Sequence, residues 1–357
     1  MLELENIIKE RNIEKELRLE NLTLENWESK REEIKNLFLK EVYGFLPKKL
    51  VPTIDKELCS VDFAGKASWE SIYFTFENNG KTHKVKTELI LPKEKQNIPV
   101  FLYISFSPDV PNKYLPVEEI LDGGFGIFTF YYENVTKDAR GYENDLGSLF
   151  DKDEITCGKI SMWAYMVGVM RDYLETRSEV GPVGVVGHSR LGKTALLASA
   201  LDNRFVLTCS NESGCSGAAL SRGKKEGNET IGDICKVFPF WFTANYYKYI
   251  ENEKAQFFDQ HMLLALVAPR CLMIGGAEKD YWADNEGQML SCYLASPIWK
   301  LYGKEGFVIN KVPCEGDKFL KGNVTYHQRG GTHFLSRADW QVYMKKFKEL
   351  LRGENEI

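Results

Sequence analysis

The first fifty residues have the pattern of charged, amphipathic helices. Trp27, Ile34 and Phe38 recur at helical spacing and fall on roughly one face of a predicted helix. Pro47 interrupts this helical pattern. We therefore predict a helical N-terminal extension over residues 1–50 that packs onto the rest of the chain.

Beyond this extension, short apolar runs alternate with helix-like segments. A β-hairpin comes first, because Asn78-Asn79-Gly80 separates two strand-like segments. The runs 100–104 and 125–132 are apolar throughout, as expected of strands that are buried on both faces. The alternation predicts an α/β fold in three layers, with a mostly parallel central sheet and helices on both faces. Further strands are predicted at 183–186, 205–209, 271–274 and 323–327, and helices at 160–174, 261–267 and 337–351.

Length and composition limit the possible classes of protein. The chain has 357 residues, and no repeat or long linker divides it, so we predict a single domain over residues 1–357. Its 43% hydrophobic and 27% charged residues are ordinary values for a globular protein. The net charge of −5 gives no basis for binding nucleic acid or an anionic membrane, so we expect neither as a partner. The oligomeric state stays open.

Cysteine usage and the first residues favour the cytoplasm. The eight cysteines form no C-x-x-C pair, and several lie inside apolar runs, as buried free thiols do in a reducing compartment. Residues 1–11 are charged and lack the apolar core of a signal peptide. The histidines are scattered, without the clustered ligands of a zinc site, so we expect no metal and no cofactor.

The strongest chemical signal is the segment Gly187-His188-Ser189-Arg190-Leu191-Gly192-Lys193. It follows the apolar run 183–186 and leads into residues 194–198, which favour a helix. A serine on a tight turn between a strand and a helix exposes its hydroxyl, and the helix N-terminus offers backbone N–H groups to a developing negative charge. The segment departs from G-x-S-x-G, because its second glycine comes one residue late. It predicts an α/β-hydrolase fold with Ser189 as the nucleophile.

Ser189 needs a base, and the chain offers His83, His188, His261, His327 and His333. His333 follows two glycines and precedes the last predicted helix, which is where the base of an α/β-hydrolase lies. His188 adjoins Ser189, and neighbouring side chains on a turn diverge, so we expect it to pack beside the site. His333 is therefore the predicted general base.

The carboxylate that orients this histidine has two candidate positions. Glu212 follows the strand after the serine helix. Glu278 and Asp280 follow the next predicted strand, with Asp284 close behind. Both positions keep the chain order of serine, acid and histidine, and spacing alone does not choose between them.

The oxyanion of a tetrahedral intermediate needs hydrogen-bond donors. The backbone N–H of Arg190 follows the nucleophile directly and is suited to this role. The Arg190 guanidinium is a second, charged candidate donor, although pairing with a surface carboxylate is the commoner role of an arginine.

Three segments together resemble the glucuronoyl esterases, a family of carbohydrate esterases. The serine segment is similar to their G-C-S-R-x-G-K motif, with His188 in place of cysteine. Residues 211–217 resemble their E-S-G-x-G-G segment, with Ser216 in place of a glycine, and residues 259–270 resemble their D-x-H-x-L-x-A-L-x-A-P-R run. The resemblance extends from about Trp27 to the C-terminal helix. More broadly, the chain is similar to acetyl xylan esterase-like enzymes of the α/β-hydrolase superfamily.

The resemblance implies a catalytic role for particular residues. It implies Ser189 as the nucleophile, His333 as the base and Glu212 as the acid, with Glu278 in reserve. Arg190 would then help to bind the oxyanion.

The resemblance also implies sugar contacts from Lys193 and Trp282, to which we add His188 beside the nucleophile. The expected activity is that of a serine carboxylic-ester hydrolase that forms an acyl-enzyme. Its expected substrate is a small-molecule or oligosaccharide ester, either an acetylated sugar or a uronic acid ester. Two alternatives keep the same residues, namely an acyltransferase and a non-catalytic carbohydrate-binding protein of the same fold.

Overall fold

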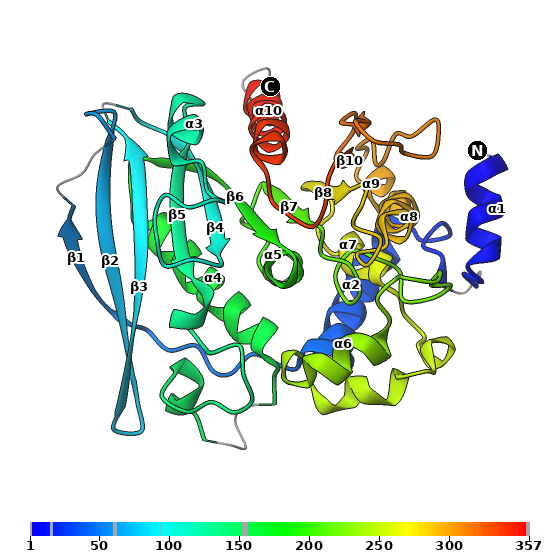
Figure 1. The fold of residues 1–357 in the computed structure, drawn as a ribbon, viewed down its shortest axis with the longest axis horizontal. Coiled ribbons are helices and arrows are strands. Elements are labelled where there is room, and N and C mark those ends of the chain that lie inside the picture. The colour runs from blue at the N-terminus through cyan, green and yellow to red at the C-terminus, as the bar shows by residue number, and fades with distance from the viewer. Residues whose placement is uncertain (1, 15–16, 60–62, 94, 152–155, 355–357) are drawn as a thin grey trace.

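A mixed ten-stranded sheet forms the centre of the protein, with helices on both of its faces (Figure 1). The computed structural model describes residues 2–14, 17–59, 63–93, 95–151 and 156–354. In order across the sheet, the strands are β1 (Thr53–Leu58), β2 (Ala67–Asn78), β3 (Lys81–Pro92), β5 (Gly126–Tyr131), β4 (Ile98–Ser105), β6 (Val180–His188), β7 (Leu207–Asn211), β8 (Cys271–Ala277), β10 (Val324–Arg329) and β9 (Lys318–Phe319).

The strands from β5 to β10 run parallel, and both edges of the sheet are antiparallel. The parallel part confirms the predicted α/β architecture. Its strands are apolar because both faces are covered, and all residues of β8, for example, are buried. The antiparallel β1 was missed by sequence reasoning because all six of its residues are exposed, so it lacks a buried face to produce a pattern.

The predicted hairpin joins β2 to β3. Asn78 pairs with Lys81, which leaves Asn79-Gly80 as a two-residue loop. Both loop residues have positive φ angles, 51° and 70°, as a type I′ turn requires. The turn therefore matches the Asn-Gly signal in the sequence.

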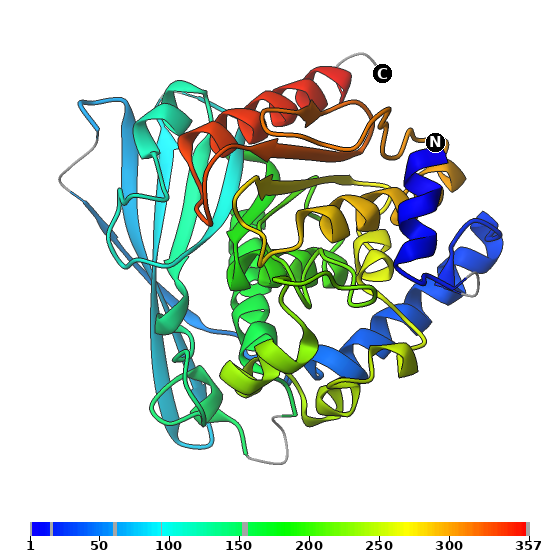
Figure 2. The same cartoon turned by 45° about the vertical axis from the view of Figure 1, so that its right-hand side comes forward.

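Two groups of helices cover the two faces of the sheet (Figure 2). The first group contains α3 and α10, which pack Ile120 and Trp340 against Phe101 of β4. The second group contains α4, α5, α7 and α8, which contribute to the larger apolar core. The helices are α1 (Leu2–Glu10), α2 (Leu24–Phe38), α3 (Val117–Asp122), α4 (Lys159–Glu175), α5 (Arg190–Leu201), α6 (Ile231–Val237), α7 (Gln260–Ala265), α8 (Asn285–Ala295), α9 (Pro297–Leu301) and α10 (Arg337–Glu354).

The N-terminal helices α1 and α2 pack against the rest of the molecule (Figure 2). Ile8 of α1 and Trp27, Ile34 and Phe38 of α2 are all buried within the larger core. None of the helices in the described ranges combines the length and the hydropathy of a membrane span.

Candidate active site

Ser189 lies on a strained turn between β6 and α5. Its backbone has φ 56° and ψ −127°, in a region that a residue with a Cβ adopts only at a cost. Gly187 makes the turn possible, because a Cβ at this position would lie 1.9 Å from the carbonyl oxygen of Leu191. The backbone N–H of Ser189 donates to the carbonyl oxygen of Asn211 at 2.8 Å, which ties the turn to β7. The turn has the geometry predicted from the glycine-flanked serine.

The displaced second glycine also has a physical reason. A Cβ at Gly192 would lie 3.0 Å from Cβ of Ser213 and 3.1 Å from the carbonyl oxygen of Asn211. Gly192 therefore lets α5 approach the end of β7, while the bulkier Leu191 is buried in the apolar core. The glycine is needed on the helix face that meets β7, one residue later than in G-x-S-x-G.

The N-terminus of α5 supplies a donor for an oxyanion. Ser189 is the N-cap residue and Arg190 is the first residue of the helix. The backbone N–H of Arg190 accordingly belongs to the first turn, where N–H groups have no acceptor inside the helix. This N–H and the positive end of the helix dipole adjoin the serine hydroxyl.

Two carboxylates meet the imidazole of His333. Nδ1 of His333 donates to Oδ2 of Asp280 at 2.6 Å, and Oε2 of Glu212 lies 3.2 Å from the same nitrogen. Glu212 follows β7 and Asp280 follows β8, so the parallel sheet brings their two loops together. Both positions left open by the sequence are therefore occupied by an acid that contacts the predicted base.

Glu278, the reserve acid that the resemblance implied, forms no ion pair with His333 among the described residues. Its backbone N–H donates to the carbonyl oxygen of Arg329 at 2.8 Å, which continues the pairing of β8 with β10. Its side chain lines a different cavity, together with Arg11 and Lys225. The acid of this loop that reaches His333 is Asp280, two residues further along the turn.

The electrostatics of the three groups are coupled. Burial raises the pKa of Glu212 to about 7, against the opposing effects of His333 and Arg329. Burial lowers the pKa of His333, but hydrogen bonds to Asp280 and Glu212 outweigh this effect and raise it to about 9. Burial acts to raise the pKa of Asp280, but the hydrogen bond to His333 outweighs this effect and lowers that pKa. The site favours an imidazolium at His333, which is the charged form that a general base acquires during catalysis.

Arg329 holds the base and one acid in place, and sequence reasoning missed it. Its Nη2 donates to Oε1 of Glu212 at 2.7 Å, and its Nε donates to Oδ2 of Asp339 at 2.9 Å. The backbone N–H of Phe334 donates to Oε2 of Glu212 at 3.0 Å. The loop that carries His333 is therefore bound to Glu212 on both sides of the histidine. An arginine at the end of a strand gives no sequence signal for this role.

His188 is buried beneath His333, and its place in the predicted substrate-binding set stays a prediction. The two rings lie 4.5 Å apart between centroids, and Nδ1 of His188 is 2.7 Å from Oδ1 of Asn211. Burial and the neighbouring His333 lower the pKa of His188 to about 3, so its ring is neutral. His188 packs against the base instead of facing solvent, in keeping with the expectation that it lies beside the site.

The contact of His333 with His188 places the base next to the nucleophile turn, because Ser189 is the adjoining residue. Within the described ranges, no hydrogen bond joins Oγ of Ser189 to His333. Such bonds are often long in the absence of substrate and form in the Michaelis complex.

The two sugar contacts that the resemblance implied lie in different surroundings. Lys193 is buried, its Nζ donates to the carbonyl oxygen of Ser213, and burial lowers its pKa. Trp282 is half exposed at 51%, and it lies two residues after Asp280 in the same loop between β8 and α8. Trp282 is thus available to a ligand, whereas Lys193 is covered in this structure, and both sugar contacts stay predictions.

Ligand atoms of His188, Glu212 and His333 lie within 4.8 Å of one another, close enough for a metal ion. Each residue already has a partner in the protein: Asn211 for His188, Arg329 for Glu212, and Asp280 for His333. The expectation of a metal-free site stays a prediction.

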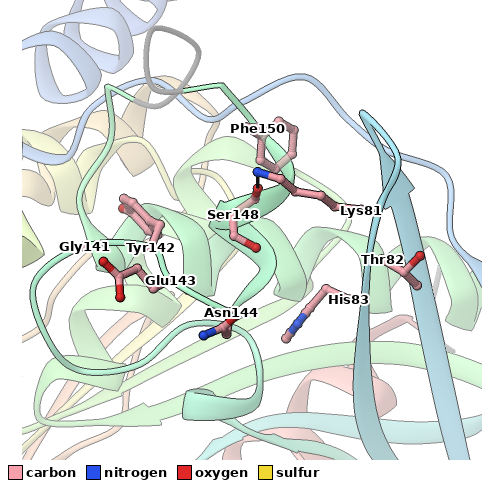
Figure 3. Close-up of a pocket in the computed structure, with 10 residues that line it drawn as sticks. Lys81, Thr82, His83, Gly141, Tyr142, Glu143, Asn144, Ser148 and Phe150 are labelled. Carbon is pink, nitrogen blue, oxygen red and sulfur yellow. Dashed lines mark hydrogen bonds between the residues drawn. The ribbon is translucent and has the colours of Figure 1, made fainter.

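A cavity of about 1110 Å³ lies between the start of β3 and the loop after β5 (Figure 3). Lys81, Thr82 and His83 line it from β3, and Nζ of Lys81 donates to the carbonyl oxygen of Ser148 at 2.9 Å. Of the described residues that line this cavity, none belongs to the predicted site.

Comparisons with known proteins agree with this site. A family model described as "Glucuronyl esterase, fungi" matches residues 74–303. The chain is 38% identical over 237 residues to "Carbohydrate esterase MZ0003" from an unknown prokaryotic organism, a match that covers 64% of this chain and 54% of the relative. It is 27% identical over 301 residues to a 4-O-methyl-glucuronoyl methylesterase of Schizophyllum commune, covering 79% of this chain and 70% of the relative.

The chain thus spans about half the length of the carbohydrate esterase that it matches. Among solved structures, a glucuronoyl esterase from Solibacter usitatus superposes with a TM-score of 0.83 at 34% identity, covering 93% of this chain and 96% of that one. A CE15 esterase from a marine bacterial metagenome superposes with a TM-score of 0.80 at 29% identity, covering 91% and 92%. These matches confirm the predicted α/β-hydrolase fold and the family resemblance. The chain belongs to the glucuronyl esterase family.

Proposed function

We propose that this protein is a serine esterase that hydrolyses a uronic acid ester of a carbohydrate through an acyl-enzyme. The observation that carries the proposal is the imidazole of His333, which contacts two carboxylates and packs beside the strained turn of Ser189. A nucleophile, a base and an acid on three loops at one edge of a parallel sheet are the parts that acyl transfer requires.

The proposed reaction has two halves. Oγ of Ser189 attacks the ester carbonyl while His333 takes its proton, and the backbone N–H of Arg190 binds the oxyanion. The tetrahedral intermediate collapses, the C–O bond to the alcohol breaks, and His333 returns the proton to the leaving alkoxide. A water molecule then attacks the acyl-enzyme with His333 again as base, which releases the uronic acid and restores Ser189.

The choice of substrate is supported by the relatives. Several fungal relatives carry the name 4-O-methyl-glucuronoyl methylesterase. The half-exposed Trp282 offers an aromatic face on the loop that carries Asp280, of the kind on which a sugar ring packs. We accordingly favour an ester of the uronic carboxyl group over an acetyl ester on a sugar hydroxyl.

The test compares methyl glucuronate esters with acetylated sugars, using the wild type and Ser189→Ala. We expect a higher kcat/KM on the methyl glucuronates and a loss of at least about a thousandfold in the variant. A preference for acetylated sugars would contradict the proposed substrate but would still support an esterase activity. If the wild-type protein turned over neither set of esters, the result would favour the non-catalytic carbohydrate-binding alternative. An acyltransferase would release ester product when a sugar alcohol is added.

For localisation we propose a reducing compartment, the cytoplasm. All eight cysteines have free thiols, and six of them are buried. Fractionation of cells of the source organism, with detection by antibody, tests this proposal, and recovery of the protein outside the cells would contradict it.

A further inference from the structure

We propose that Asp138 is a positioning residue that holds the guanidinium of Arg190 at the catalytic serine. The proposal rests on the proposed esterase function, in which Arg190 helps to bind the oxyanion. Neither the sequence motif nor the family resemblance pointed to Asp138, which lies 51 positions before Ser189 in the loop after β5.

Asp138 forms a partly buried polar junction with Arg190. Oδ2 of Asp138 accepts from Nη1 of Arg190, and the Asp138 side chain is only 9% exposed. Oδ1 of the same carboxylate accepts from Nε1 of Trp241 at 2.6 Å, and the hydroxyl of Tyr132 donates to Oδ2 at 3.3 Å. One carboxylate therefore joins the loop after β5, the N-terminus of α5 and the segment after α6.

Aromatic rings complete the enclosure of the guanidinium. Its central carbon lies 4.5 Å from the ring centroid of Trp241, 4.9 Å from that of Phe238 and 5.8 Å from that of Phe106. Phe238 and Trp241 stack on each other with centroids 3.9 Å apart and an angle of 3° between their planes. A cation against aromatic faces is attracted to them, and planar arginine suits such a site better than lysine.

The loop that carries Asp138 is itself anchored to the protein. Lys159 of α4 is buried, and its Nζ donates to Oγ1 of Thr136 and to the carbonyl oxygen of Gly141. The same Nζ lies 3.3 Å from Oδ2 of Asp145. Asp138 therefore lies between Thr136 and Gly141, two positions of the loop that Lys159 holds by hydrogen bonds, and these bonds restrict the movement of its carboxylate.

This arrangement has a consequence for catalysis. An arginine side chain has several rotatable bonds, and a donor that must be ordered during the reaction stabilises the transition state less than one already in place. Asp138 takes one of the five N–H donors of Arg190, which leaves other donors for the oxyanion. Loss of Asp138 should therefore reduce kcat and leave KM almost unchanged, because the oxyanion exists only after attack has begun.

The main experiment is a double-mutant cycle with Asp138→Ala and Arg190→Ala on a methyl glucuronate ester. We expect Asp138→Ala alone to reduce kcat by about 10- to 100-fold, with KM within about twofold of the wild type. In the Arg190→Ala background, the same substitution should reduce kcat by less than about twofold further. Asp138→Asn keeps one carbonyl oxygen as an acceptor but loses the charge that pairs with Arg190, so its kcat should lie between those of the wild type and Asp138→Ala.

A second measurement separates positioning from general damage to the fold. Added guanidinium ion should partly restore kcat in Arg190→Ala, because Asp138 and the aromatic rings can hold the free cation. It should not restore kcat in the double variant. Asp122→Ala serves as the matched control, since Asp122 also pairs with a cation, Lys66, but is 58% exposed at the surface, and its kcat should equal that of the wild type.

Two outcomes would overturn the proposal. The first is that the kcat losses of Asp138→Ala and Arg190→Ala multiply fully in the double variant, and that added guanidinium ion restores kcat equally in Arg190→Ala and in the double variant. The second is wild-type activity in Arg190→Ala, which would remove the group that Asp138 is proposed to hold. Neither outcome affects the esterase function itself, which depends on the loss of turnover in Ser189→Ala.

Discussion

Nδ1 of His333 lies 2.6 Å from Oδ2 of Asp280 and 3.2 Å from Oε2 of Glu212, so two acids share one imidazole. The two acids are not equivalent. Glu212 also accepts from Arg329 and from the backbone N–H of Phe334, whereas the shorter bond to His333 belongs to Asp280. This asymmetry determines what each substitution should do.

The pH dependence of the esterase should follow the titration of His333. The imidazole acts as a base only when neutral, and its pKa is raised to about 9 by Asp280 and Glu212 in spite of burial. Below this pH the imidazolium dominates, so kcat/KM should rise with pH and level off near pH 9. Initial rates corrected for uncatalysed ester hydrolysis measure the profile. A profile that is already flat at about pH 7 would contradict the raised pKa.

Asp280→Asn should move this profile and lower its plateau. Removing the carboxylate removes the first of the effects that raise the pKa of His333, so the rising limb should shift to lower pH. Loss of the acid in a triad with one acid costs about 10⁴-fold in kcat. Because Glu212 remains in contact, we expect a smaller loss of about 10- to 100-fold.

Glu212→Gln is the comparison for this variant. The substitution leaves the bond from His333 to Asp280 intact but removes the charge that pairs with Arg329. The variant should therefore lose unfolding free energy as well as kcat. The double variant should approach the full loss of about 10⁴-fold. If both single variants kept wild-type kcat, neither acid would have the proposed role.

The two glycines of the serine segment should respond differently to alanine. At Gly187 the new methyl would lie 1.9 Å from the carbonyl oxygen of Leu191, a backbone atom that cannot move without distorting the turn. We expect Gly187→Ala to lose about 1–3 kcal/mol of unfolding free energy or more, together with its esterase activity. At Gly192 the nearest atom is Cβ of Ser213 at 3.0 Å, so Gly192→Ala should fold with a smaller loss. Urea unfolding of both variants provides the measurement, and equal losses would contradict the geometry.

Sequence patterns predicted the features of this protein that depend on local spacing. The apolar runs predicted the buried parallel strands, and the glycines around Ser189 predicted the turn. His333 was predicted from its place after the last strand, and it does meet the predicted acid positions. The strands and the turn depend on residues close together in the sequence, whereas His333 was predicted from the chain order of an α/β-hydrolase site.

Features that depend on distant contacts were not predicted. The sequence could not separate Glu278 from Asp280, because the course of a turn decides which of two nearby acids reaches His333. Asp138 and Arg329 act on residues 52 and 117 positions away, so no local pattern marks them. The burial of His188 depends on the loop of His333 folding over it.

Arg11 supplies the last prediction, because it joins the N-terminal extension to the loop of Asp280. Its guanidinium is 1% exposed and donates to both carboxylate oxygens of Asp284, at 3.0 and 2.8 Å, and to Glu286 at 3.0 Å. Asp284 caps α8 with a left-handed backbone, four residues after Asp280. Arg11→Met would leave the buried Asp284 with Lys224 as its remaining cationic partner in the described structure.

Removal of one member of a buried ion pair leaves an uncompensated charge and costs about 3–5 kcal/mol. Because Lys224 still pairs with Asp284 in Arg11→Met, the charge stays partly compensated, and we expect a loss of unfolding free energy below this range but above about 1 kcal/mol. The control is Lys30→Met in the exposed pair with Glu33, which should lose less than about 1 kcal/mol. Urea unfolding at neutral pH measures both. Equal losses in the two variants would mean that the N-terminal extension does not support the loop of Asp280, whereas a selective loss in Arg11→Met would make residues 1–50 part of the structure on which the active site depends.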